Sequence, residues 1–172
     1  MKYVIPEADA CAIRDFMAPY MKYDEYSART EDGSYLISSL YCDSHDLRLF
    51  SETMTGQKNR AKLRIRCYND DPATPVFLEI KRRVESVIFK TRASVARSAV
   101  KSCLEDGLPP RPEETSNVES AVKYLTMMDR YRAEPVVRVR YKREAYESAD
   151  DYPLRITFDR HLTRKMTSVY DL

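Results

Sequence analysis

The chain has 172 residues and a net charge of only +2, from 29 Lys and Arg residues against 27 Asp and Glu residues. The length suits one domain with a substantial core, and so small a net charge does not argue for general affinity for nucleic acids or membranes. Four cysteines without a CxxC pair, three glycines and two histidines argue against a disulfide framework, a Walker-type phosphate loop and a zinc cluster, and no apolar run is long enough to cross a bilayer.

The first part of the chain predicts a helix, a strand and a second helix. Pro6 suits the first turn of a helix, and Glu7 and Asp9 suit its positive end. Residues 35–41 (YLISSLY) have the composition of a strand. Ser44 is positioned to cap a helix that ends near Gly56.

The rest of the chain predicts mainly strands, with two helices between them. The predicted strands are 61–68, 76–86, 87–94, 135–147 and 153–162, and the predicted helices are 95–105 and one that starts at Ser116 or Asn117. A turn, SADDY (148–152), joins the last two strands. Short turns between consecutive strands favour antiparallel pairing, so the predicted fold is α+β, in a single domain over residues 1–172.

Several predicted strands have one apolar face and one basic face. Alternation places Lys62, Arg64 and Arg66 on one face, opposite Leu63 and Ile65. Ordinary strands with a solvated outer face would give the same pattern. However, KLRIR and FKTR contain no acid, and like charges on neighbouring strands repel each other. A bound anion would offset that repulsion, and arginine forks suit phosphate oxygens.

The motifs along the chain also resemble a known family. MKYDEYS, followed by DGSYLISSLYCDSHDLRLFSETMTGQKNRAKLRIRCYN, is similar to the signature of VTC domains, the polyphosphate polymerase branch of the triphosphate tunnel enzymes. The segments FLEIKRR, IFKTRAS, RYKREAYES and LRITFDRHL follow in the same order. The resemblance implies an antiparallel, β-barrel-like tunnel with flanking helices, in which basic side chains bind ATP and polyphosphate.

The resemblance implies seven phosphate-binding residues by motif. Arg64 and Arg66 match an RxR pair, Lys81 matches the lysine of EIK, and Lys90 matches a further tunnel lysine. The remaining matches are Arg143 in YxRxA, Arg155 in RIxxD, and Lys2 in KY, which resembles a lysine of the first tunnel strand. Simple alternation puts Arg143 on the opposite face from Arg138 and Arg140, and a β-bulge near Tyr141 would reconcile the motif with the strand.

The resemblance also implies Mn²⁺ or Mg²⁺ as a cofactor, although no metal ligand or catalytic residue is assigned. Glu79 shares a face with Lys81 and could lie near the metal, but it is interpreted as an ion-pair partner that separates two cations. Family members usually start a few residues earlier and continue into a strand with a metal-binding glutamate and an SKY-like lysine. The chain is therefore expected to be a fragment or to have an incomplete tunnel.

Three functions follow from this sequence. The first is a polyphosphate polymerase that uses ATP. The second is a hydrolase of triphosphate or polyphosphate, although the ExExK motif of such hydrolases is missing. The third is a non-catalytic polyphosphate-binding module, and a nucleic-acid binder is a weaker fourth reading because aromatic residues rarely interleave with the cations.

We expect a cytoplasmic protein, either free or held at the cytosolic face of a membrane by a partner or a longer parent protein. Arg64→Ala or Arg66→Ala is expected to weaken triphosphate binding and to leave the fold intact or more stable.

Overall fold

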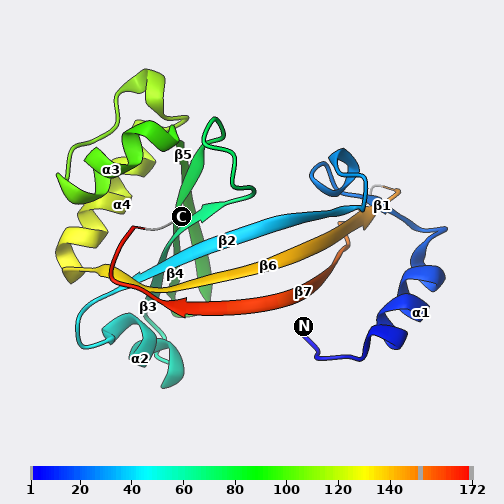
Figure 1. Cartoon of the computed structure of the whole chain (residues 1–172). Helices are drawn as coiled ribbons and strands as arrows, with labels where there is room; N and C mark the ends of the chain where they lie inside the picture. The colour runs from blue at the N-terminus through cyan, green and yellow to red at the C-terminus, as the bar shows by residue number, and fades with distance from the viewer. Residues whose placement is uncertain (1, 151–152, 171–172) are drawn as a thin grey trace. The chain divides into compact units, whose positions relative to one another are not determined.

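The computed structural model describes residues 2–150 and 153–170. The chain forms two compact units, and three long strands run through both of them (Figure 1). These strands are β2 (Ser34–Asp43), β6 (Glu134–Ser148) and β7 (Arg155–Met166). Part of the turn predicted at 148–152 lies outside the described residues, and so do both ends of the domain predicted over 1–172.

Unit 1 consists of Met1–Leu36 with Tyr141–Leu162. It contains α1 (Glu7–Met17), β1 (Met21–Tyr23) and a short 3-10 helix, η1 (Ser27–Arg29). The predicted first helix is confirmed, and Glu7 and Asp9 lie in its first turn. Strand β1 pairs antiparallel with the end of β6. A small apolar core joins α1 and β1 to β6 and β7: Ala10, Met17, Met21, Tyr146 and Phe158.

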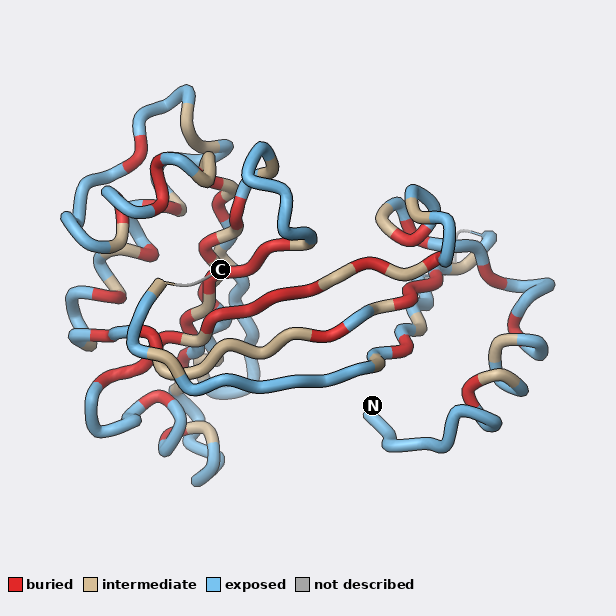
Figure 2. The backbone as a smooth tube through the Cα atoms, viewed as in Figure 1, coloured by how far each residue is buried: buried red, intermediate tan, exposed pale blue. Residues whose placement is uncertain are grey.

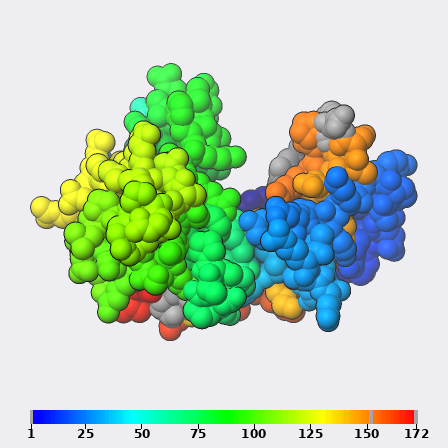
Figure 3. All heavy atoms as spheres, turned by 90° about the horizontal axis from the view of Figure 1, so that it is seen from above, coloured from blue at the N-terminus to red at the C-terminus, as the bar shows by residue number. Residues whose placement is uncertain are grey.

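Unit 2 consists of Ile37–Arg140 with Thr163–Leu172. Its helices are α2 (Arg48–Met54), α3 (Arg97–Glu105) and α4 (Val118–Tyr131), with a 3-10 helix η2 (Pro112–Glu114). Its strands are β3 (Arg60–Cys67), β4 (Val76–Val84) and β5 (Val87–Val95). Figure 3 shows α3 and α4, in green to yellow, forming an outer surface of this unit.

The strands form one sheet in the order β1-β6-β2-β3-β4-β5, and β7 also pairs with β6. The pairs β1·β6, β2·β3, β3·β4 and β4·β5 are all antiparallel. The predicted class, α+β with an antiparallel sheet, is confirmed. Figure 2 shows long buried stretches along β2, whereas most of β7 is exposed.

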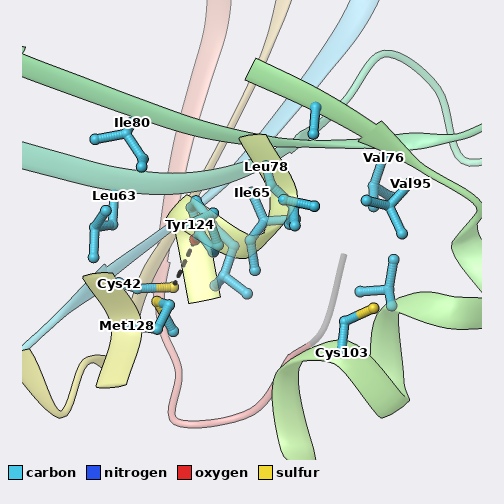
Figure 4. Close-up of a cluster of buried hydrophobic side chains, with 14 of the residues drawn as sticks. Cys42, Leu63, Ile65, Val76, Leu78, Ile80, Val95, Cys103, Tyr124 and Met128 are labelled. Atoms are coloured by element: carbon cyan, nitrogen blue, oxygen red, sulfur yellow. Dashed lines mark hydrogen bonds between the residues drawn. The ribbon is translucent and has the colours of Figure 1, made fainter. Parts of the chain in front are cut away.

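The core of unit 2 lies between one face of the sheet and the helices. Leu63 of β3 pairs with Ile80 of β4, and Ile65 pairs with Leu78, so that these apolar side chains form adjacent rows. Figure 4 shows them around Tyr124 of α4, which is fully buried. The Tyr124 hydroxyl donates to the Cys42 sulfur at 3.8 Å, which gives the buried phenol a polar partner.

Helix α2 begins differently from the sequence prediction. Leu47, in a left-handed conformation, occupies the position before the helix. The Asp43 carboxylate accepts from the N–H groups of Leu49 and Phe50 at 2.8 Å each, and the Ser44 hydroxyl accepts from that of Arg48 at 3.0 Å. Two side chains therefore accept hydrogen bonds from the backbone N–H groups of the first turn, whereas the sequence predicted Ser44 as the cap.

Within the described residues, no helix is both long and apolar enough to serve as a membrane span.

Candidate functional site

The face of the unit 2 sheet opposite its core carries the basic residues. Strand alternation places eight cations here: Arg60, Lys62, Arg64, Arg66, Lys81, Arg83, Lys90 and Arg92. Glu79 is the one carboxylate among the residues of β3, β4 and β5 that share this face. Since one carboxylate cannot neutralise eight cations, this face has a strong excess of positive charge. We call it the cationic face.

The cationic face contains a row of three lysines. Lys62 of β3 lies directly opposite Lys81 of β4, which lies opposite Lys90 of β5. All three are exposed, and within the described residues none forms an ion pair. Like charges directly opposite each other on neighbouring strands are unfavourable, so an anion bound over the row would be stabilised. The motif assignment omits Lys62, although alternation places it on the same face.

Arg66 is a buried cation on the same face. Its exposed fraction is 7%, and its Nε donates to the Ser39 hydroxyl at 2.9 Å. No carboxylate in the described part of the chain pairs with it. A buried charge without a counter-charge is costly, so Arg66 favours binding of an anion from solution.

Arg64 is partnered within the face. Its Nε donates to Glu79 at 2.5 Å, and Arg92 approaches the other oxygen of Glu79 at 3.4 Å. Burial tends to lower the pKa of Arg64, but the Glu79 carboxylate outweighs it, and the pKa lies above its usual value. Glu79 therefore acts as the predicted ion-pair partner between two cations. Because this pair is lost in Arg64→Ala, that variant is expected to be less stable, which reverses the expectation from sequence.

Arg92 is fixed by aromatic residues as well as by Glu79. Its guanidinium lies 3.8 Å from the centre of the Phe77 ring and donates to the Tyr68 hydroxyl at 3.2 Å. Stacking and hydrogen bonding together restrict the side chain. Arg92 is therefore a fixed element that holds Glu79 from the side opposite Arg64.

Unit 1 holds the other predicted arginines, and each of them has a carboxylate partner. Arg143 donates to both oxygens of Asp159, at 2.7 and 2.8 Å. Burial tends to lower the pKa of Arg143, but the bond to Asp159 raises it above its ordinary value. Arg155 donates at 2.5 Å to Asp24, which is 3% exposed. A phosphate would have to compete with these carboxylates.

Tyr35 joins the Arg155 contact. Its hydroxyl donates to Asp24 at 3.2 Å, and the backbone N–H of Ser27 donates to the same carboxylate at 2.8 Å. Burial and then the Asp24 charge raise the pKa of Tyr35, whereas Arg143 and Arg155 oppose the rise. The phenol therefore remains a neutral hydrogen-bond donor.

Lys2 lies in an irregular, exposed segment before α1, and not in a strand. The first strand carries Lys22 instead, from a second copy of the same MKY triplet. The repeated triplet is a signal in the sequence that could have identified Lys22. The role of Lys2 stays a prediction.

Arg143 lies between two more deeply buried residues of β6. Tyr141 and Ala145 are buried, whereas Arg143 is half-buried and its guanidinium lies 5.2 Å from the Tyr141 ring centre. Arg140 makes a separate ion pair in unit 2, with Asp70 at 2.6 Å. The bulge predicted near Tyr141 stays a prediction.

No group of three or more His, Cys, Asp or Glu residues gathers to hold a metal ion anywhere in residues 2–150 and 153–170. The carboxylate on the cationic face, Glu79, is already engaged by two arginines. None of the described residues is therefore assigned to the implied divalent metal.

Comparison with known proteins gives a family match over nearly the whole chain. The family model for the VTC domain matches residues 1–168. No protein with a curated description matches the sequence.

Two solved structures are similar in fold. A putative adenylate cyclase from Bacillus halodurans matches with a TM-score of 0.53 at 12% identity, over 98% of this chain and 79% of the other. This match confirms the predicted fold class. A putative adenylyl cyclase from Hippeastrum, described as having a dominant triphosphatase activity, matches with a TM-score of 0.46 at 12% identity, over 96% of this chain and 77% of the other.

Proposed function

Because the chain belongs to the VTC domain family, we propose that its cationic face binds the phosphates of ATP and of polyphosphate, and that the protein is a polyphosphate polymerase. The observation that carries this proposal is the row Lys62–Lys81–Lys90, which has no carboxylate partner among the described residues. A polymerase that consumes ATP would work in the cytoplasm, where ATP is abundant.

The extent of the cationic face favours a chain of phosphates over a single one. Four basic residues alternate along β3 from Arg60 to Arg66, which at about 3.4 Å per residue spans roughly 20 Å. The lysine row crosses three strands about 4.8 Å apart, and so extends roughly 10 Å in the other direction. An elongated anion can contact several of these cations at once.

The proposed reaction adds one phosphate to a chain. A terminal oxygen of polyphosphate attacks the γ-phosphorus of ATP, the bond from that phosphorus to the β–γ bridging oxygen breaks, and ADP leaves. Such a transfer needs positioning and charge neutralisation more than covalent chemistry by the protein. Arg64, Arg66, Lys81 and Lys90 would hold non-bridging oxygens in unit 2, with Lys62 as a further contact.

The proposal also includes Arg143, Arg155 and Lys2. For Arg143 and Arg155, a phosphate oxygen would replace a carboxylate oxygen of Asp159 or Asp24. An arginine fork accepts either kind of oxygen with the same geometry. No step is assigned to a metal ion.

Incubation with ATP and Mn²⁺ or Mg²⁺, followed by gel analysis of the products, tests the reaction. Phosphate chains that grow with time support the polymerase. Release of free phosphate without chains would replace it with the hydrolase. Tight polyphosphate binding without turnover would leave only the binding module.

Titration with tripolyphosphate tests the site independently of turnover. We expect Lys81→Met to weaken binding by about tenfold or more, because a hydrogen bond to a charged group contributes roughly 1.5–3 kcal/mol. Lys101→Met is the matched control, since Lys101 is an exposed lysine of α3, away from the cationic face. Equal affinity of both variants would contradict the assignment. A single-stranded oligonucleotide that binds as tightly as tripolyphosphate would favour the nucleic-acid reading.

A further inference from the structure

The turn between β4 and β5 carries an apolar tip. Val84 pairs with Val87 around a two-residue turn, and the three residues that follow the turn are all strongly exposed. The exposed fractions of Val87, Ile88 and Phe89 are 53%, 49% and 54%. Apolar side chains scattered singly over a surface are ordinary, but three in succession at the end of a hairpin form a patch that indicates an interaction.

The backbone of the turn is held in place. Glu85 adopts a left-handed conformation, with φ of 53°, and its N–H donates to the Asn59 side chain at 3.2 Å. Its carbonyl accepts from Arg83 Nε at 2.7 Å. The apolar side chains are therefore presented by an ordered turn, which lowers the entropic cost of binding.

The tip is apolar on both faces of the hairpin. Ile88 lies opposite Arg83 and shares the cationic face. Val87 and Phe89 point to the other face, because successive side chains in a strand alternate. The flat surface of a protein partner would cover one of these faces, whereas a fluid apolar medium surrounds both. A tip with apolar side chains on both faces is therefore suited to insertion into such a medium.

Basic residues lie directly behind the tip. Lys81, Arg82, Arg83 and Lys90 lie within a few positions of it, and the turn contains one acid, Glu85. Apolar tips backed by Lys and Arg are attracted to anionic lipid surfaces, because the cations meet the headgroups while the apolar groups enter the acyl boundary. We propose that the β4–β5 tip docks the protein onto an anionic bilayer.

A tryptophan reporter tests this proposal. The sequence contains no tryptophan, so Phe89→Trp provides a single emission signal. We expect its emission to shift to the blue, and to be quenched by brominated lipids, with vesicles of phosphatidylcholine containing phosphatidylserine. Phe50→Trp on α2 is the matched control, because Phe50 is 57% exposed but lies outside the tip. We expect no shift for this variant.

Co-sedimentation with the same vesicles measures the affinity. Replacing both Val87 and Phe89 by serine should weaken it by about tenfold or more, because these half-exposed side chains, which lie on the face opposite the cationic face, lose their burial in the bilayer. Arg82→Gln should weaken it several-fold and reduce its dependence on salt. Unchanged tripolyphosphate binding by the serine variant shows that the fold is intact, and keeps this test separate from that of the phosphate site.

Three results would overturn the proposal. The first is wild-type protein that fails to co-sediment with anionic vesicles, or that co-sediments equally with pure phosphatidylcholine. The second is a serine variant that binds as the parent does. The third is a Phe89→Trp emission shift that appears without vesicles as protein concentration rises, which would assign the tip to self-association.

Discussion

Replacing the lysines of the cationic face one at a time should stabilise the protein in the absence of ligand. Lys81 has a lysine on each side, whereas Lys62 and Lys90 each face one lysine within the row. Cross-strand pairs contribute roughly 0.2–1 kcal/mol, and like charges are unfavourable by a similar amount. Taking about 0.5 kcal/mol for each relieved pair, Lys81→Met should gain about 1 kcal/mol, and Lys62→Met or Lys90→Met about half of that. Methionine keeps an apolar stem of similar length, so little packing is lost.

Urea denaturation at low ionic strength measures these gains in unfolding free energy. The gains should disappear in about 1 M salt, where the screening length falls to about 3 Å. Lys101→Met on α3 should show no gain, because Lys101 lies 3.8 Å from Glu105. If Lys81→Met is no more stable than the parent at low salt, or if its gain persists at high salt, repulsion along the row is not the cause.

Other contacts give three further predictions. Arg66→Met should weaken tripolyphosphate binding by about tenfold or more, measured by calorimetry, because it removes a buried cation that has no carboxylate partner among the described residues. Glu144→Gln should lower the unfolding free energy by roughly 2–4 kcal/mol in urea, because the buried Glu144 carboxylate pairs with Arg160 at 2.7 Å. Burial raises the pKa of Cys42 to about 12 from an ordinary value of 9.0. The stabilisation from this buried thiol is present in full below pH 9 and is lost as the pH rises towards 12. Cys42→Ala should therefore reduce the fall in unfolding free energy that alkaline denaturation measures.

Strand faces could be predicted from the sequence because alternation is local. The apolar Leu63 and Ile65 and the basic Arg64 and Arg66 occupy the faces that a simple period of two assigns to them. The lysine row was harder to predict, because it depends on the register between strands. That register is set by turn geometry and by packing of the whole apolar face. Alternation alone places Lys62 beside Arg64 and Arg66, but only the pairing of β3 with β4 brings it opposite Lys81.

Pairing between residues far apart in the sequence explains other features that the sequence analysis did not predict. Strand β1 has only three residues, too few to show a period, and exists because the end of β6 pairs with it. The carboxylate partners of Arg143 and Arg155 are 16 and 131 residues away in sequence, so no local pattern could identify them. The cap of α2 was a local choice between Asp43 and Ser44, and the structure uses both.

The predicted arginines of unit 1 have carboxylate partners, whereas the lysine row of unit 2 has none among the described residues, and this difference should affect phosphate binding. In unit 1, Arg143 and Arg155 are each neutralised by a carboxylate, so an incoming phosphate meets a smaller net attraction there. In unit 2, the lysine row has no such partner among the described residues, and an incoming anion gains its full attraction. Phosphate should therefore engage the lysines at lower concentration than the two arginines. Because the negative charges of Asp24 and Asp159 oppose an incoming anion, engagement of the arginines should also depend more strongly on the charge of the ligand.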